Sequence, residues 1–183
     1  MDFEKVLTNL LTEFEGRRIR YALMGGFALS LWGVPRATVD LDFLVALDDM
    51  AGVHEVLKSM GYERLHHTEN VSQYRSPSQD MGEIDFIHAF RKASEGMLNR
   101  AVGRQILGGR NTIRVLLPED IVGLKVQAIA NNPSRRPTDQ ADIEALMQLH
   151  GGRMRWDRIR EYFDLFSFSD LCAELESRYR GSE

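Results

Sequence analysis

The chain has 183 residues, of which 43% are hydrophobic and 27% charged, and its formal net charge is −4 at pH 7. This size fits one domain, or one domain with a small helical addition, and the apolar fraction suffices for a packed core. A pI near 5.8 argues against non-specific nucleic-acid binding through overall charge, although it leaves room for a local basic patch.

The composition also bears on the compartment. The single Cys172 excludes an internal disulfide framework and fits a reducing environment. Asp2 and Glu4 stand where a signal peptide would carry basic residues, and no apolar run approaches the roughly 20 residues that span a bilayer. We therefore expect a cytoplasmic protein with no membrane partner.

Hydrophobic periodicity predicts that helices and strands alternate along most of the chain. In chain order the expected elements are a helix over 2–14, a strand over 21–24, a helix over 27–32, a strand over 36–45, a helix over 48–60, a hairpin of strands 71–76 and 83–88 joined by 77–82, a helix over 92–106 and a strand over 112–116. A helix begins at Pro118, a polar loop covers 131–137, Asp139 opens another helix, and two short helices lie within 153–180.

This order predicts an α/β fold in which helices flank a mixed sheet of short strands, followed by a helical C-terminal part. We expect the core to cover 1–117 and the helical segment 118–183, and a single domain is the alternative.

The strand 36–45 gathers polar side chains on one face. Arg36, Thr38, Asp40 and Asp42 share that face, and the opposite face is apolar. Side chains two residues apart on a strand lie about 6.5–7 Å apart, so two carboxylates can converge on one cation. At about 4 Å their repulsion is on the order of 4 kcal/mol near a protein surface, and a divalent cation turns it into attraction. The pattern predicts metal ligands at Asp40 and Asp42.

Gly25 and Gly26 follow the strand 21–24 directly and precede the short helix. Glycine lets backbone N–H groups approach a ligand closely, and the start of a helix favours phosphate. The same stretch therefore predicts a phosphate-binding turn beside the carboxylate pair.

Gly25-Gly26, a thirteen-residue spacer and Asp40-Leu41-Asp42 resemble the signature of the nucleotidyltransferase superfamily related to DNA polymerase β. In that superfamily a third carboxylate arrives on a later strand, and Asp85 in its apolar surroundings matches it; an exposed Asp on an edge strand is the alternative. Arg36, Thr38, Asp40 and Asp42 also match the Arg-x-Thr-x-Asp-x-Asp pattern of small bacterial members grouped with the toxins of abortive-infection (type IV) toxin–antitoxin systems. Gly26 departs from the serine that many active members carry.

The resemblance implies a polymerase β-like fold and an enzyme that moves an NMP group from an NTP to a hydroxyl or phosphate acceptor. It implies two Mg²⁺ ions held by Asp40, Asp42 and Asp85, and a nucleotide bound by Gly25, Gly26 and Arg36. RNA, particularly tRNA, or a protein is the implied acceptor, with an aminoglycoside-type molecule left open and a cognate antitoxin as a partner. A non-catalytic nucleotide- or partner-binding module, which Gly26 allows, and a metal-dependent phosphohydrolase are the alternatives.

Lys125 interrupts an apolar stripe on the helix that begins at Pro118. Its stem could pack inward while its ammonium reaches solvent. The resemblance instead implies a catalytic lysine that holds the triphosphate, since similar proteins place one in this helix. Arg136 and Asp142 match an Arg-x-x-Asp-x-x-Asp run of the toxin-like proteins, and Asp142 would pair with Lys125 or Arg136 to orient it. The helix dipole alone also favours acids in a first turn.

Four arginines surround Trp156 near the C-terminal end: Arg153, Arg155, Arg158 and Arg160. Such a cluster could grip an RNA backbone while the indole stacks on a base. The alternative is a solvated face whose charge Glu161 and Asp164 balance.

Overall fold

The computed structural model describes residues 1–78 and 80–181. Gln79, inside the expected turn 77–82, and residues 182–183, at the end of the expected segment 118–183, lie outside the described residues. The chain divides into two compact units. Unit 1 comprises Met1–Ala28 and Arg36–Leu116, and unit 2 comprises Leu29–Pro35 and Leu117–Glu183.

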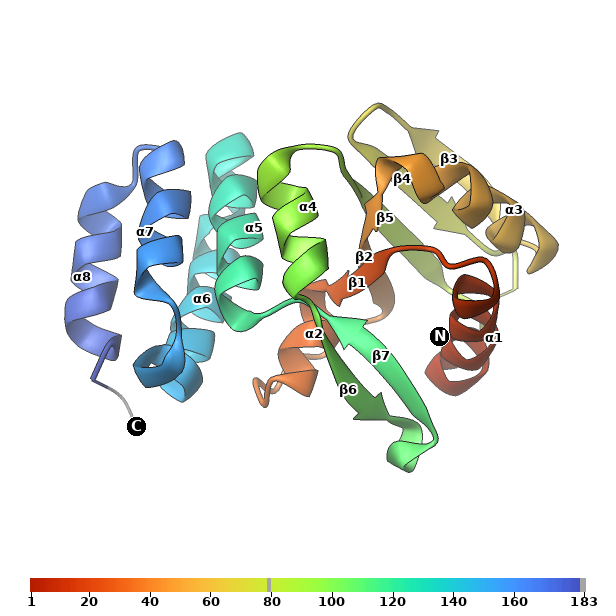
Figure 1. Ribbon diagram of the computed structural model, residues 1–183, viewed down its shortest axis with the longest axis horizontal. Helices are drawn as coiled ribbons and strands as arrows, with labels where there is room; N and C mark the ends of the chain where they lie inside the picture. The colour runs from red at the N-terminus through yellow and green to blue at the C-terminus, as the bar shows by residue number, and fades with distance from the viewer. Residues whose placement is uncertain (79, 182–183) are drawn as a thin grey trace. The chain divides into compact units, whose positions relative to one another are not determined.

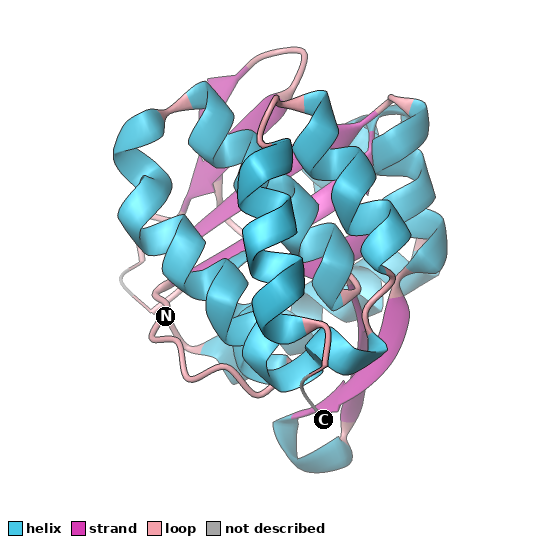
Figure 2. Ribbon diagram, turned by 90° about the vertical axis from the view of Figure 1, so that its left-hand side faces the viewer, coloured by secondary structure: helices cyan, strands magenta, loops and turns pink. Residues whose placement is uncertain are grey.

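Unit 1 is built on one mixed sheet, drawn in magenta in Figure 2. Its strands are β1 (Tyr21–Met24), β2 (Asp40–Ala46), β3 (Glu63–His67), β4 (Val71–Arg75), β5 (Glu83–Ala89), β6 (Val102–Ile106) and β7 (Asn111–Val115), labelled in Figure 1. The strand order is β3-β4-β5-β2-β1-β7-β6. β2 pairs with β5, and β1 with β7, in parallel, and the other neighbours are antiparallel. The expected α/β fold with a mixed sheet is confirmed.

Aromatic side chains fill the core on one face of this sheet. The helices of unit 1 are α1 (Phe3–Gly16), the start of α2 (Gly25–Leu31), α3 (Met50–Ser59) and α4 (Lys92–Arg100). The ring of Phe14 in α1 packs against Phe43 of β2 at 6.2 Å, and Phe43 stacks on Phe86 of β5 at 5.8 Å between centroids. Because side chains alternate along a strand, Asp42 and Asp85, the neighbours of these rings, point to the opposite face.

The strand that carries the two aspartates is shorter than expected. β2 begins at Asp40, so Arg36 and Thr38 precede it and the expected strand 36–45 is wrong over 36–39. β5 starts at Glu83, the register partner of Asp40, so it offers no partner for earlier residues. The hydroxyl of Thr38 also donates to the backbone oxygen of Asp40 at 3.2 Å, a local bond that competes with strand pairing.

Two further strands differ from expectation. The helix expected over 92–106 ends at Arg100, and Ala101 (φ −53°, ψ 142°) leads into β6, which pairs with β7. This hairpin turns through the 3-10 segment Leu107–Gly109, where Leu107, Gly108 and Gly109 all have positive φ. β3 was not expected, because its residues are all exposed and show no apolar alternation.

Unit 2 consists of helices that run side by side in Figure 1: α5 (Pro118–Asn131), α6 (Arg136–His150), α7 (Trp156–Leu165) and α8 (Ser169–Tyr179). The two short helices expected within 153–180 are confirmed, whereas α6 begins three residues before Asp139, within the expected loop 131–137. A Cβ on Gly123 would lie 2.5 Å from the Tyr162 ring, so glycine lets α5 approach α7 closely. In the part of the chain that the structure describes, no helix combines the length and apolarity needed to cross a bilayer.

Candidate active site

The parallel pairing of β2 with β5 places Asp42 beside Asp85. Their Cα atoms are register partners, as are those of Asp40 and Glu83. Register partners on parallel strands point to the same side, and neighbouring strands lie about 4.8 Å apart. The three carboxylates named from the sequence therefore share one face. β5 lies between β4 and β2, so Asp85 is not on an edge strand.

Gly25 makes room for the carboxylate of Asp42. A Cβ at position 25 would lie 1.9 Å from Oδ2 of Asp42, which is far inside van der Waals contact. Gly25 also has φ +67°, in the left-handed region that other residues rarely adopt. The carboxylate of Asp42 therefore rests against the backbone at the first residue of α2.

Gly26 is covered by residues that precede β2. A Cβ at position 26 would lie 2.9 Å from Cβ of Thr38 and 3.6 Å from Cγ of Arg36. The hydroxyl of Thr38 donates to Oδ1 of Asp40 at 2.6 Å. Arg36, Gly26 and Asp40 thus lie around one threonine, although Arg36 is outside the strand that was expected to place it.

The environment of Asp85 raises the pKa of its carboxyl above the usual value of an aspartate. Burial is the main cause that raises the pKa of Asp85, and the negative charges of Asp40 and Glu83 raise it further. A hydrogen bond from Nε2 of Gln73 to Oδ2 of Asp85, 3.1 Å long, acts in the opposite direction. A positive charge placed among these acids would favour the ionised form.

The donor set fits Mg²⁺, which binds carboxylate oxygens. Oδ1 of Asp85 is buried and has no hydrogen-bond partner among the described residues, an unfavourable state for a carboxylate oxygen without a cation. No three His, Cys, Asp or Glu side chains within residues 1–78 and 80–181 already form a ready-made metal-binding group. Mg²⁺ binding would therefore require the carboxylates of Asp40, Asp42 and Asp85 to draw closer together.

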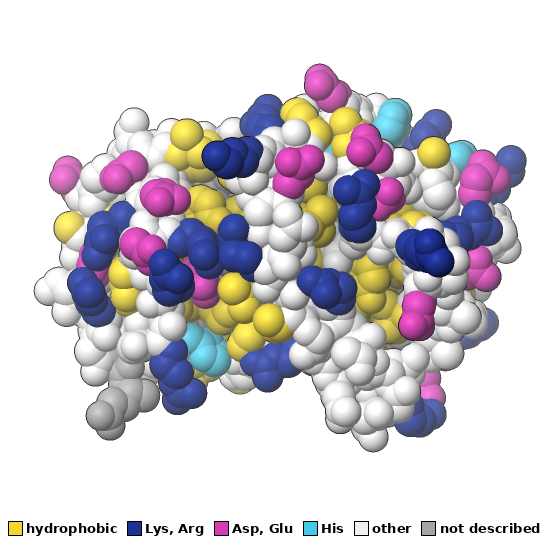
Figure 3. All heavy atoms as spheres, in the orientation of Figure 1, with side chains coloured by type: hydrophobic (Ala, Val, Ile, Leu, Met, Phe, Trp, Pro, Cys, Tyr) yellow, Lys and Arg dark blue, Asp and Glu magenta, His cyan; other side chains and the backbone are white. Residues whose placement is uncertain are grey.

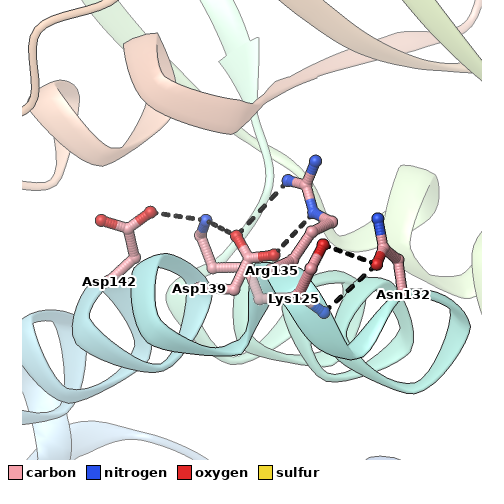
Figure 4. A network of polar contacts seen from close by, with 6 residues as sticks. Lys125, Asn132, Arg135, Asp139 and Asp142 are labelled. Carbon is pink, nitrogen blue, oxygen red and sulfur yellow. Dashed lines mark hydrogen bonds and ion pairs between the residues drawn. The ribbon is translucent and has the colours of Figure 1, made fainter.

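In unit 2, Lys125 lies between two acids of α6. Its ammonium donates to Oδ1 of Asp139 at 2.9 Å and to Oδ2 of Asp142 at 2.7 Å. Arg135 donates to the other oxygen of Asp139 at 2.8 Å, so that carboxylate stands between two cations (Figure 4). Burial would raise the pKa of Asp139, but the hydrogen bonds from Arg135 and Lys125 prevail and lower it below its usual 3.8.

In this network Asp142 accepts a hydrogen bond from Lys125. Of the two pairings considered from the sequence, the one between Asp142 and Lys125 is present, and the guanidinium of Arg136 instead donates to Gln140 at 3.2 Å. The side chain of Lys125 is 12% exposed, so its ammonium is not simply extended into solvent.

Three of the four C-terminal arginines are paired with acids. Arg155 pairs with Asp157, Arg158 with Glu119 and Arg160 with Glu176. These partners differ from Glu161 and Asp164, which the sequence suggested. On the face drawn in Figure 3, basic side chains are interspersed with acidic ones, as on a solvated face whose charges balance.

Two residues of this region were not identified from the sequence as part of the site. Gln73 is the register partner of Asp85 on β4, and Glu83 is the register partner of Asp40 on β5. Alternation along 71–75 puts Gln73 on the same face as Val71 and Arg75, but the sequence does not show which residue of the next strand it faces.

Comparison with known proteins identifies the family and the fold. A family described as uncharacterised nucleotidyltransferase matches residues 3–173. No curated protein sequence matches the chain. The solution structure of the antibiotic-resistance factor ANT(2'')-Ia is similar with a TM-score of 0.65 and 15% identity, over 97% of this chain and 99% of that one.

Two other structures share the fold. An antigenic nucleotidyltransferase-like protein from Paracoccidioides brasiliensis has a TM-score of 0.58 and 16% identity, over 96% of this chain and 92% of that one. The lincosamide antibiotic adenylyltransferase LnuA has a TM-score of 0.54 and 17% identity, over 80% of this chain and 97% of that one. With a family match that spans most of its length, the chain belongs to the family of uncharacterised nucleotidyltransferases, within the polymerase β-like superfamily that its glycine and aspartate motifs resemble.

Proposed function

We propose that this protein is a Mg²⁺-dependent nucleotidyltransferase of the phosphotransferase class, which moves an NMP group from an NTP to a hydroxyl or phosphate acceptor. The observation that carries the proposal is the register pair of Asp42 and Asp85, with Asp42 against the backbone of Gly25 and Oδ1 of Asp85 buried without a hydrogen-bond partner in the described part of the chain. A purely structural strand pair has no need for two adjacent carboxylates on one face.

In the proposed reaction the acceptor oxygen bonds to the α-phosphorus while the bond from that phosphorus to the departing pyrophosphate breaks. Asp40, Asp42 and Asp85 would hold two Mg²⁺ ions, and Asp85 or solvent would take the acceptor proton. Bound Mg²⁺ supplies charge neutralisation at the phosphates and lowers the pKa of the acceptor hydroxyl. The phosphates approach the backbone at Gly25 and Gly26, where the absence of side chains gives close access.

Arg36 and Lys125 offset the charge of the triphosphate in this proposal. The stem of Arg36 lies next to Gly26, which supports a role at the phosphates. Lys125 uses two of its three N–H donors on Asp139 and Asp142, which leaves one for a phosphate oxygen. Asp142 then orients the lysine, whereas the contact of Arg136 with Gln140 gives Arg136 no direct part in that orientation.

For the acceptor we propose RNA, particularly tRNA, or a protein side chain, and for the biological role a toxin with a cognate antitoxin. The pattern formed by Arg36, Thr38, Asp40 and Asp42 supports this choice. A small antibiotic-like acceptor is the second candidate, because a structure of ANT(2'')-Ia contains adenylyl-2''-tobramycin and that of LnuA contains lincomycin.

The test is a transfer assay with each α-labelled NTP and Mg²⁺, offered tRNA, total protein, tobramycin and lincomycin in separate reactions. We expect label on one acceptor with equimolar pyrophosphate, and no label with the Asp42→Ala variant. Calorimetric NTP binding without pyrophosphate release from any acceptor would favour a non-catalytic binding module. Nucleotide hydrolysis without label transfer would favour a phosphohydrolase.

A further inference from the structure

Four carboxylates, rather than three, occupy the same face of β2 and β5. They form two register pairs, Asp40 with Glu83 and Asp42 with Asp85. All four are candidates for a shared cation on position alone. Three of them have partners that distinguish their roles: Asp40 meets a hydroxyl, Asp85 an amide and Glu83 a guanidinium.

Thr38 holds one oxygen of Asp40. Its hydroxyl donates to Oδ1 at 2.6 Å and lies against Gly26, where a side chain at position 26 would meet Oγ1 at 3.0 Å. The packing against Gly26 restricts the rotation of Thr38 and therefore the orientation of the carboxylate it binds. A hydroxyl is neutral, so the negative charge of Asp40 stays available to a cation.

Gln73 holds one oxygen of Asp85 in the same manner. It is the register partner of Asp85 across β4 and β5, and its amide donates to Oδ2 at 3.1 Å. The other oxygen, Oδ1, is the buried atom without a hydrogen-bond partner among the described residues. One oxygen is thus fixed by a neutral donor and the second is left for a ligand.

Glu83 differs because its partner is charged. Arg75, its register partner on β4, donates from Nε to Oε1 at 2.8 Å and makes a second, shorter contact from its terminal nitrogen. The pair is about half exposed, so its contribution to stability is small. The guanidinium nevertheless offsets the charge of Glu83 and occupies the oxygen nearest to it.

We propose that Thr38 and Gln73 are positioning residues that present Asp40 and Asp85 to the metal, and that Arg75 keeps Glu83 out of the metal-binding set. This inference rests on the proposed metal site. Hydrogen-bond partners of metal ligands fix ligand orientation, and their loss typically weakens metal binding about 10–100-fold. The positioning by Thr38 and Gln73 and the exclusion of Glu83 therefore both predict changes in affinity for the metal ion, which can be measured without any acceptor.

The experiment is a Mn²⁺ titration of the full chain without nucleotide, in which electron paramagnetic resonance measures the concentration of the free ion. Thr38→Val and Gln73→Met remove the donors while keeping similar volumes, and we expect each to weaken Mn²⁺ binding about 10-fold or more. Thr38→Ser keeps the hydroxyl and should restore most of the affinity. Glu83→Gln should leave the affinity within about threefold of the original, because Glu83 does not bind the ion.

The variants separate this inference from the proposed function. If Asp42→Asn binds Mn²⁺ as well as the original chain, the metal is not held at this face and the proposed site itself is wrong. If Asp42→Asn loses Mn²⁺ but Thr38→Val and Gln73→Met retain it, the positioning role is overturned alone. A loss in Glu83→Gln equal to that in Asp42→Asn would place Glu83 among the ligands. Circular dichroism verifies folding, and Thr38→Ala replaces the valine variant if that one does not fold.

Discussion

Gly25 gives the sharpest test of how the site is built, through the substitution Gly25→Ala. A non-glycine residue in the left-handed region costs roughly 1–2 kcal/mol, and Gly25 has φ +67°. The new Cβ would lie 1.9 Å from Oδ2 of Asp42, whereas a carbon–oxygen contact is about 3.3 Å or longer. The carboxylate must therefore move by roughly 1.4 Å, or the start of α2 must shift by a similar amount.

These two effects have separate consequences. For a chain of this size, 1 kcal/mol changes Tm by about 2–4 °C, so the backbone cost predicts a fall of about 2–8 °C. A displacement of about 1 Å at a catalytic group can reduce turnover about 100-fold. We therefore expect Gly25→Ala to remain folded at room temperature and to lose about 99% of its nucleotidyl transfer.

Gly61→Ala is the matched control. Gly61 follows α3 with φ +83°, so alanine there carries the same backbone cost, but nothing lies within 4 Å of the added Cβ. Gly25→Ala should lose at least as much Tm as Gly61→Ala in thermal unfolding, because only its new Cβ meets the Asp42 carboxylate, and only Gly25→Ala should lose label transfer and Mn²⁺ binding. Equal turnover in the two variants would refute the claim that Asp42 acts from its position against Gly25.

Three further substitutions test other parts of the proposal. Asp42→Ala should abolish transfer while circular dichroism and Tm stay near those of the original chain, because it removes a repelling charge beside Asp85; unchanged turnover would remove Asp42 from the chemistry. Lys125→Ala leaves Asp139 and Asp142 without their shared cation, so urea unfolding should show a loss of about 3–5 kcal/mol together with a higher KM for NTP. A change in stability alone would restrict Lys125 to packing. The pKa of Asp139 in the folded state lies below its usual 3.8. The ionised carboxylate therefore stabilises the fold above about pH 4, and this stabilisation is lost as the pH falls through the folded-state pKa. The difference in unfolding free energy between the original chain and Asp139→Asn should therefore be constant near neutral pH and narrow below about pH 4, and a difference independent of pH would contradict this assignment.

The sequence predicted which side chains share a face of a strand better than it predicted which residues of the neighbouring strand they lie beside. Alternation along β2 correctly separated Asp40 and Asp42 from Leu41 and Phe43, because that pattern depends only on the chain itself. The pairing of Asp42 with Asp85 joins residues far apart in the chain, and the register between two strands depends on packing that no local pattern contains. For the same reason the sequence did not identify Gln73 as the partner of Asp85.

The errors in secondary structure have a common origin. Residues 102–106 carry apolar side chains at a spacing that fits a helix, and only pairing with β7 makes them a strand. β3 is an exposed edge strand whose pattern contains no apolar face, so its backbone pairing with β4 determines it. The strand expected from Arg36 begins only at Asp40. The hydroxyl of Thr38 bonds locally to the backbone oxygen of Asp40, and alternation of polar and apolar residues does not reveal such a bond.

The acidic partners of Lys125 follow from features that the sequence itself contains. Asp139 and Asp142 are three residues apart on α6 and so share a face, and a short connection makes α5 and α6 antiparallel neighbours. An inward lysine on α5 then meets both acids, as it does here. With Arg135 also bound to Asp139, two cations face two anions in this cluster. Removal of the Lys125 ammonium breaks two of these ion pairs, so it should lower the stability of unit 2. If Lys125 also binds the nucleotide, as proposed, Lys125→Ala should lower stability and nucleotide affinity together.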